Sequence, residues 1–245
     1  MDLKHLLVSA AVNAALAAAS FAAGAVSLSG VVGGFVVGFL ILFFGGWGPF
    51  GILCAFFVFG SAATKLGYSR KAALGVAQDE KGRRGAKHAF ANCAAAALAA
   101  LLYRWSSTSD PTGAHWALVV LAGAFATALS DTVSSEIGQL YGKHPFLITT
   151  LKPVPVGTDG AVSLEGTLAG LAAGALIGLL GWLFALYGPV AILFVAIGAF
   201  IGTTFESILG AVGSAKKRMN NELLNFLNTV VGGLAAGVLT LVFRG

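Results

Sequence analysis

Long apolar runs separated by short polar connections dominate the chain. Mainly hydrophobic stretches cover roughly residues 5–22, 25–44, 48–64, 88–104, 115–137, 165–187, 189–211 and 223–243. A helix needs about 20 such residues to cross the hydrocarbon core of a bilayer. The pattern therefore predicts an all-α fold, a polytopic transmembrane helix bundle with seven or eight spans. It leaves open whether the first two runs form two helices or one broken element.

The composition excludes a soluble protein. Charged residues make up 10% of the 245 residues and apolar residues 57%, and the mean hydropathy is +0.87, whereas soluble domains carry about 25% charged residues. Cys54 and Cys93 fall inside apolar runs without metal-site spacing, which favours buried thiols. We expect one integral membrane domain over 1–245: N-terminal spans in 1–64, a basic loop at 65–87, and a core at 88–245 with site loops at 138–165 and 210–222.

The basic residues predict the orientation. Seven lie in 65–87, two are Lys143 and Lys152, and three form the run 216–218. Two spans separate successive groups, so one face would hold 12 of the 15 basic residues. The positive-inside rule makes that face cytoplasmic, in a bacterial, thylakoid or organelle membrane. The net charge of +5 thus reflects topology, and no nucleic-acid partner is expected.

Glycines recur at helix-packing spacing. Gly166, Gly170, Gly174 and Gly178 form overlapping GxxxG units. Small residues let helix backbones approach closely in lipid. The pattern indicates a compact bundle and is compatible with a homo-oligomer. Similar spacing occurs at Gly30/Gly34/Gly38, Gly198/Gly202 and Gly233/Gly237.

The stretch "SDTVSSEIGQL" (130–140) places two acids at the end of an apolar run. A charge near the hydrocarbon costs about 2.5–3.5 kcal/mol at a helix centre, so we interpret Asp131, Glu136 and Glu206 as functional; interfacial solvation or pairing with Lys or Arg is the alternative. Five residues on a helix turn through about 140°, so Asp131 and Glu136 cannot share one face.

Two oxygen-rich helix faces each carry one acid. Asp131 shares a face with Ser134, Ser135 and Gly138, and Glu206 stands with Thr203. Such sets suit Mg²⁺, which takes a few carboxylates plus phosphate oxygens. A faint parallel repeat, "DTVSSEIG" (131–138) and "ESILGAVG" (206–213), would bring both acids to one depth. Chance similarity in so biased a composition explains the repeat equally well. The repeat therefore only supports the expectation that Asp131 and Glu206 lie at the same depth.

Two further segments have polar side chains in a site-like pattern. Asn221, Asn225 and Asn228 lie on one helix face, where interhelical hydrogen bonding alone is the alternative. The loop 149–166 combines glycines that can turn amides toward an anion with a lysine and oxygen ligands; a plain connector is the alternative. Its candidates are Lys152, Gly157, Thr158, Asp159, Gly160 and Ser163.

These parts together suit phosphoryl transfer to a lipid phosphate. Catalysis of that reaction is mostly positioning and charge neutralisation. A phosphate monoester with a second pKa of about 6 is already largely dianionic at pH 7, so no catalytic histidine is needed. The expected substrate has a polyanionic head and a hydrophobic tail.

Four motifs resemble those of the phytyl-phosphate kinase family. They are "ATALSDTVSSEIGQ", "LITTLKPVPVGTDGAVSLEGTLAG", "GTTFESILGA" and "NELLNFLNT", within a resemblance over about 30–243. The resemblance implies Mg²⁺-dependent conversion of phytyl phosphate, or a related prenyl phosphate, to the diphosphate in vitamin E and phylloquinone synthesis, with a nucleoside triphosphate, first of all CTP. Two departures are His88, where Gln is expected, and Glu206, where Asp is expected.

The residues and the resemblance together indicate a role for each candidate. Asp131, Glu136 and Glu206 are the expected metal ligands. Asp131, Glu136, Lys152 and Asp159 are the expected catalytic residues. Substrate or nucleotide binding is assigned to Arg84, Asn92, Ser135, Gly157, Thr158, Gly160, Ser163, Ser207, Asn221, Asn225 and Asn228.

Three other functions compete with the kinase. A secondary transporter would use Asp131 and Glu206 as ion sites, although transporters bind near the midplane, whereas these polar residues gather toward one face. A CTP-dependent cytidylyltransferase would need much the same residues. A structural or assembly factor would explain the glycines and leave the acids unexplained.

Overall fold

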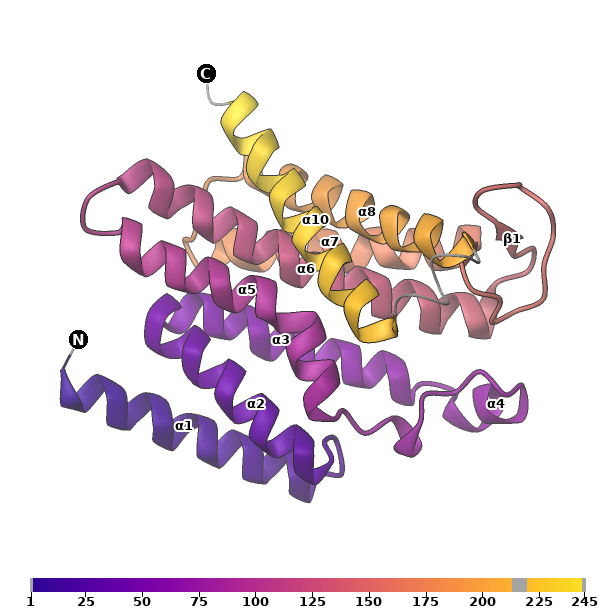
Figure 1. The fold of residues 1–245 in the computed structure, drawn as a ribbon, viewed down its shortest axis with the longest axis horizontal. Helices are drawn as coiled ribbons and strands as arrows, with labels where there is room; N and C mark the ends of the chain where they lie inside the picture. The colour runs from indigo at the N-terminus through magenta and orange to yellow at the C-terminus, as the bar shows by residue number, and fades with distance from the viewer. Residues whose placement is uncertain (1, 213–219, 244–245) are drawn as a thin grey trace.

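The computed structural model describes residues 2–212 and 220–243 and forms a helical bundle (Figure 1). The all-α membrane fold predicted from the apolar runs is confirmed. Its first elements are α1 (Leu3–Ala22), α2 (Leu28–Leu40), the π-helical turn η1 (Ile41–Gly45), α3 (Trp47–Lys65), α4 (Tyr68–Ala73) and the 3₁₀ turn η2 (Glu80–Gly82). They are followed by α5 (Ala86–Ser106), α6 (Pro111–Tyr141), the short strands β1 (Phe146–Leu147) and β2 (Ala161–Val162), α7 (Leu164–Leu183), α8 (Val190–Ala211) and α10 (Asn221–Val242).

Seven of the described helices are long and apolar enough to cross a membrane. They are α1, α2 together with η1, α3, α6, α7, α8 and α10. The first two apolar runs are therefore two helices, joined by a short turn at residues 23–27. Ser27 caps α2 by accepting a hydrogen bond from the backbone of Gly30.

The eighth predicted span, 88–104, is the alanine-rich helix α5. It is not among the seven apolar helices, because it carries Lys87, Asn92 and Arg104. It nevertheless packs along α2, α6 and α10. Its buried residues are mostly alanines, whose small side chains allow close packing on its neighbours.

The longest helix, α6, is the centre of the bundle. It contacts α3, α5, α7, α8 and α10, and nearly every residue from Ala117 to Ser130 is buried. At 1.5 Å per residue its 31 residues span about 46 Å, more than the hydrocarbon thickness of about 30 Å. The C-terminal turns of α6 therefore extend into the layer of loops that surrounds the candidate site.

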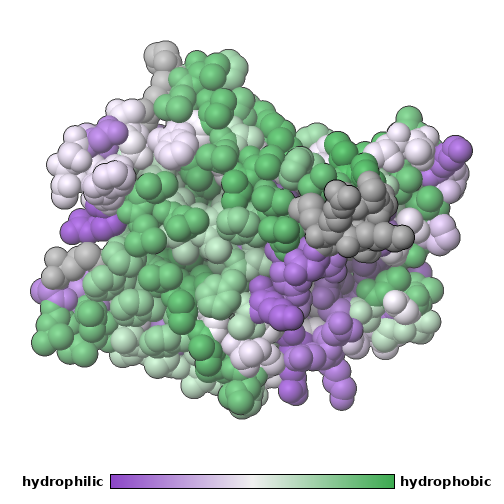
Figure 2. All heavy atoms as spheres, in the orientation of Figure 1, coloured by the Kyte–Doolittle hydropathy of each residue, from purple (hydrophilic) through white to green (hydrophobic). Residues whose placement is uncertain are grey.

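The long described loops lie at one end of the bundle. Figure 1 shows α4, β1 and the C-terminal end of α8 on the right, whereas both chain ends and the α5–α6 turn lie on the left. Figure 2 shows a broad hydrophobic surface across the middle, with hydrophilic side chains gathered most densely toward the loop end. The loop 65–87 and the α6–α7 loop, which contains Lys143 and Lys152, thus lie at the same end of the bundle, as predicted. Lys216, Lys217 and Arg218 lie outside the described residues, and the cytoplasmic orientation stays a prediction.

The predicted glycine spacing corresponds to real helix contacts at most positions. A Cβ added to Gly166 would lie 2.6 Å from the backbone oxygen of Ser134 on α6. One added to Gly202 would lie 2.6 Å from the backbone oxygen of Asn228 on α10. Gly34 differs, because a Cβ there would meet nothing within 4 Å. A repeat in the sequence therefore does not identify which glycines the packing needs.

Candidate functional site

A cavity of about 390 Å³ lies between α6, α7, α8 and the loop that connects α6 to α7. From α6 it is lined by Asp131, Ser134, Ser135 and Gly138, the face that helix geometry predicted. Ser134 donates to the backbone oxygen of Ser130 at 2.6 Å, a bond that holds its hydroxyl against the helix. One wall of the cavity therefore carries a carboxylate among small, oxygen-bearing side chains.

The α6–α7 loop forms the second wall. Strands β1 and β2 pair antiparallel, with Phe146 opposite Val162, and close the loop into a hairpin. Gly157 and Gly160 have φ of +84° and +74°, which favour glycine. Ser163 ends the loop and caps α7 by accepting a hydrogen bond from the backbone of Gly166 at 3.2 Å. The hairpin thus presents polar residues to the cavity on a defined backbone; they include Gly157, Thr158, Asp159, Gly160 and Ser163.

Helix α8 supplies the third wall. Thr203, Glu206 and Ser207 line the cavity near the C-terminal end of α8. The loop packs on this end, because a Cβ at Gly160 would overlap the backbone around Ser207. Asp131 and Glu206, which the faint repeat paired, therefore line the same cavity from two different helices.

Asn228 stands beside this cavity on α10. It is fully buried and interacts with Asp131. Neither atom of its amide group reaches hydrogen-bonding geometry with any residue in the described ranges. The amide therefore lies close to the Asp131 carboxylate at the edge of the cavity, and a ligand there would complete its hydrogen bonding.

Several predicted residues lie away from the main cavity. Lys152 is exposed and is not part of the lining. Asn221 is exposed and Asn225 half-buried, and neither lines the cavity, so only the last member of the asparagine stripe lies next to it. Asn92 is buried in α5 and donates to the backbone oxygen of His88 at 2.9 Å.

Arg84 occupies a different, smaller cavity of about 60 Å³. Its guanidinium lies over the ring of Phe56, 5.1 Å from the ring centroid, and His88 and Cys93 also line this space. Burial lowers the pKa of Arg84, and the charge of Glu136 acts in the opposite direction. Arg84 is therefore separated from the main cavity, in a space lined by residues of α2, α3 and α5.

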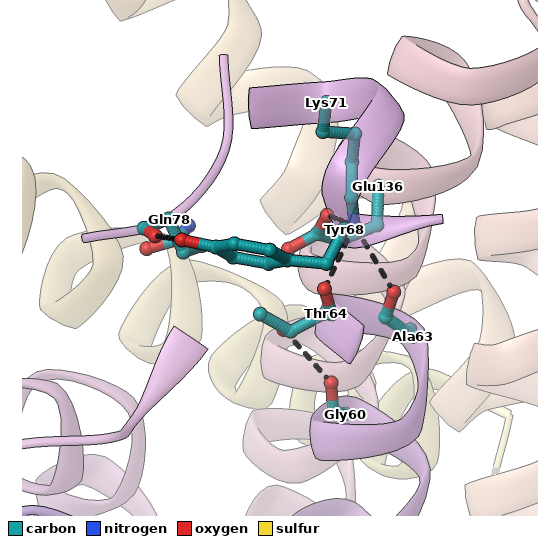
Figure 3. A network of polar contacts seen from close by, with 7 residues as sticks. All are labelled: Gly60, Ala63, Thr64, Tyr68, Lys71, Gln78 and Glu136. Carbon is teal, nitrogen blue, oxygen red and sulfur yellow. Dashed lines mark hydrogen bonds and ion pairs between the residues drawn. The ribbon is translucent and has the colours of Figure 1, made fainter. Parts of the chain in front are cut away.

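Glu136 faces away from Asp131 and is held by Lys71 of α4 (Figure 3). The two side chains form an ion pair and are almost completely buried. Lys71 also donates to the backbone oxygens of Thr64 at 2.9 Å and Ala63 at 3.3 Å, at the end of α3. Pairing with a lysine, the alternative considered for these acids, is what the structure shows for Glu136, and it keeps this side chain out of the cavity.

The three acids predicted to hold a metal do not form one cluster. Within the described ranges, no three His, Cys, Asp or Glu side chains come together as a metal site. Asp131 and Glu206 remain in the cavity with Asp159 on the loop. Mg²⁺ is commonly held by one or two carboxylates plus substrate phosphates and water, so this donor set still fits that ion.

Some residues that line the cavity were not predicted from the sequence. Gln139 lies four residues after Ser135 and thus on the same helix face, which was a usable signal. Thr167 and Thr204 also line the cavity, but nothing in the sequence distinguished them from the other threonines of the chain. Leu171 and Phe200 also line the cavity, and as ordinary apolar residues of apolar helices they gave no signal. Lys71 was one of seven basic residues in its loop, and nothing local marked it as buried.

Comparisons with known proteins agree with this architecture. The profile of the family described as "Integral membrane protein DUF92" matches residues 11–233. The chain belongs to this family. No solved structure matches the chain.

Three relatives of the chain come from distant organisms. The uncharacterized membrane protein sll0875 of Synechocystis is 43% identical over 192 residues, 78% of this chain and 73% of the relative. Protein VTE6, chloroplastic, of Arabidopsis thaliana is 40% identical over 193 residues, 76% of this chain and 57% of the relative. The uncharacterized membrane protein MJ0933 of Methanocaldococcus jannaschii is 36% identical over 80% of this chain and 77% of the relative. The chain thus spans little more than half of VTE6 but about three quarters of the microbial relatives.

Proposed function

We propose that this protein is a prenyl-phosphate kinase that transfers a phosphoryl group from a nucleoside triphosphate to phytyl phosphate. CTP is the first candidate for the nucleotide. The observation that supports this most is the cavity in which Asp131, Glu206 and a glycine-containing polar loop meet beside membrane-spanning helices. The motif resemblance supports the same reaction, and so does 40% identity to VTE6, a chloroplastic protein.

The proposed reaction needs no strong base. An oxygen of the lipid monophosphate forms a bond to the γ-phosphorus of the nucleotide. The bond from that phosphorus to the β–γ bridging oxygen breaks, and the nucleoside diphosphate leaves. Since the attacking phosphate is largely dianionic at pH 7, the protein has mainly to align the two phosphates and offset their charge.

Different residues of the cavity would align the two phosphates and offset their charge. Asp131 and Glu206 would hold Mg²⁺, which when bound neutralises phosphate charge. Gly157 and Gly160 let the loop backbone approach phosphate oxygens, and Thr158 and Ser135 add hydroxyl donors. The buried amide of Asn228, without a hydrogen bond of its own, would orient the Asp131 carboxylate or a phosphate oxygen.

Lys152 retains a narrower proposed role. It lies on the same hairpin as Gly157, exposed to solvent rather than in the cavity. An exposed lysine on this loop would attract the negatively charged nucleoside triphosphate from solution. The proposed orientation places this loop on the cytoplasmic side or its organelle equivalent.

A product assay tests the proposal. Purified protein in lipid nanodiscs is incubated with Mg²⁺, phytyl phosphate and each of CTP, ATP, GTP and UTP in turn. The expected products are phytyl diphosphate and a nucleoside diphosphate. Release of pyrophosphate instead would show cytidylyl transfer. Flux of a solute in sealed proteoliposomes without nucleotide consumption would show a transporter, and either result would overturn the kinase.

A further inference from the structure

The main cavity lies in a fork between two helices that diverge. On the far side from the loop, α7 and α8 touch: a Cβ at Gly174 would lie 3.0 Å from the Cβ of Ala199, and one at Gly178 would lie 2.9 Å from the backbone oxygen of Ile192. These contacts form the closed end of the fork. Next to these contacts, Leu171, about one turn before Gly174 on α7, and Phe200, the residue after Ala199 on α8, line the cavity.

Different neighbours hold the two arms of the fork. On the loop side of the closed end, Gly170 and Gly166 of α7 pack against Ser130 and Ser134 of α6. Gly202 of α8 packs against the backbone of α10. Gly202 also packs against Thr127 of α6. Because α7 is fixed to α6, and α8 to α10 and α6 together, the space between the arms belongs to the architecture of the bundle.

The cavity has walls of two kinds. At the loop end, Thr158 and Asp159 make it polar. At the closed end of the fork, Leu171 and Phe200 make it apolar, and these side chains are 37% and 43% exposed on helices apolar enough to span a membrane. Since both helices are long and apolar enough to cross a membrane, this apolar part of the cavity lies between two membrane-spanning helices.

We propose that the apolar chain of a phosphate-bearing lipid enters this cavity sideways from the bilayer, between α7 and α8, and lies against Leu171 and Phe200. Its phosphate then points toward Asp131 and the loop. This inference rests on the proposed function for the identity of the head group. It adds a chain-binding subsite and assigns separate mouths to the lipid and to the water-soluble co-substrate.

Narrowing the fork tests the subsite. Leu171→Trp and Phe200→Trp put a larger side chain between the arms. Leu168→Trp and Ile201→Trp are matched controls, because these residues are exposed on the same helices without lining the cavity. Binding of phytyl phosphate (20 carbons) and of dimethylallyl phosphate (5 carbons) is measured in detergent without nucleotide, on variants that elute as monodisperse as the wild type.

The wild type should bind phytyl phosphate at least tenfold more tightly than dimethylallyl phosphate. The two fork variants should weaken phytyl phosphate at least tenfold and change dimethylallyl phosphate less than twofold, while the controls match the wild type. Phe200→Ala gives a second, non-obstructing change that should reduce the preference for the long chain. Equal loss of both ligands, or equal effects in the controls, would overturn the subsite.

The binding assay separates this inference from the proposed reaction. Preference for the long chain, with no nucleotide consumed in the product assay, would keep the fork and reject the kinase. Phosphoryl transfer with no dependence of binding on chain length would keep the kinase and reject the fork.

Discussion

Asp131 and Glu136 lie five residues apart on α6 and face opposite sides of it. Asp131 lines the main cavity and lies beside Asn228, whereas Glu136 is paired with Lys71 on the side of α4. One short acidic stretch thus contributes to a ligand cavity and to the attachment of a loop. The two acids should respond to substitution in different ways.

Replacing Asp131 should remove activity and leave the fold intact. Asp131→Asn keeps the size of the side chain but removes a charge that the proposed reaction uses. Loss of one electrostatic contact to a transition state typically costs about 10²–10³-fold in rate, so phosphoryl transfer should fall at least about 100-fold. Thermal unfolding in detergent, followed by tryptophan fluorescence, should stay within a few degrees of the wild type. Unchanged turnover would remove Asp131 from the site.

Breaking the Lys71–Glu136 pair should lower stability. Removing one partner leaves the other charge buried, at a typical cost of about 3–5 kcal/mol. Lys71→Met and Glu136→Gln should therefore each lower the unfolding temperature markedly. The double variant Lys71→Met/Glu136→Leu should recover most of the loss, because it leaves no buried charge. A double variant as unstable as the sum of the single variants would contradict this account.

Gly157 should be sensitive to substitution because of Val76. It has φ of +84°, and a Cβ there would overlap the side chain of Val76, which follows α4. Gly75 is a matched control, with φ of +71° and nothing within 4 Å of an added Cβ. Gly75→Ala should cost only the backbone strain, about 1 kcal/mol. Gly157→Ala should in addition displace the loop and weaken nucleotide binding.

Nucleotide affinity measured by calorimetry checks this contact. Val76→Ala should restore part of the affinity lost in Gly157→Ala, because it removes the overlapping methyl groups. If Gly75→Ala and Gly157→Ala weaken binding equally, the packing of Val76 on the loop has no functional effect.

Two glycines of one spacing motif should differ in importance. A Cβ at Gly30 would overlap the backbone oxygen of Arg84, whereas one at Gly34 would meet nothing within 4 Å. Gly30→Ala should therefore separate α2 from the segment before α5 and lower the unfolding temperature. Gly34→Ala should be neutral or slightly stabilising, since alanine is the better helix former. If both variants changed the unfolding temperature equally, the packing contact at Gly30 would not explain the sensitivity of these glycines to substitution.

Sequence periodicity predicted the helices and the divergence of Asp131 from Glu136, because both depend on local geometry. It also selected the polar face of α6. The composition of the loop, rather than its periodicity, pointed to the cavity residues Gly157, Thr158, Asp159, Gly160 and Ser163, but not to the apolar hairpin residues that line the cavity beside them. It did not predict that Lys71 would pair with Glu136, 65 residues away, because that contact depends on how α4 docks. For the same reason Lys152 was expected at the site although it is exposed. Arg84 was likewise expected among the binding residues of the site, although it lines a separate, smaller cavity.

The proposed lateral entry between α7 and α8 determines which concentration controls the supply of the lipid substrate: its concentration in the membrane. A cavity that is reached from within the membrane receives its ligand by diffusion in two dimensions, at a frequency set by the mole fraction of that ligand among the surrounding lipids. Adding inert phospholipid would therefore slow each encounter, whereas adding buffer would not. The supply of substrate to the protein would follow the makeup of its membrane rather than the volume of its compartment.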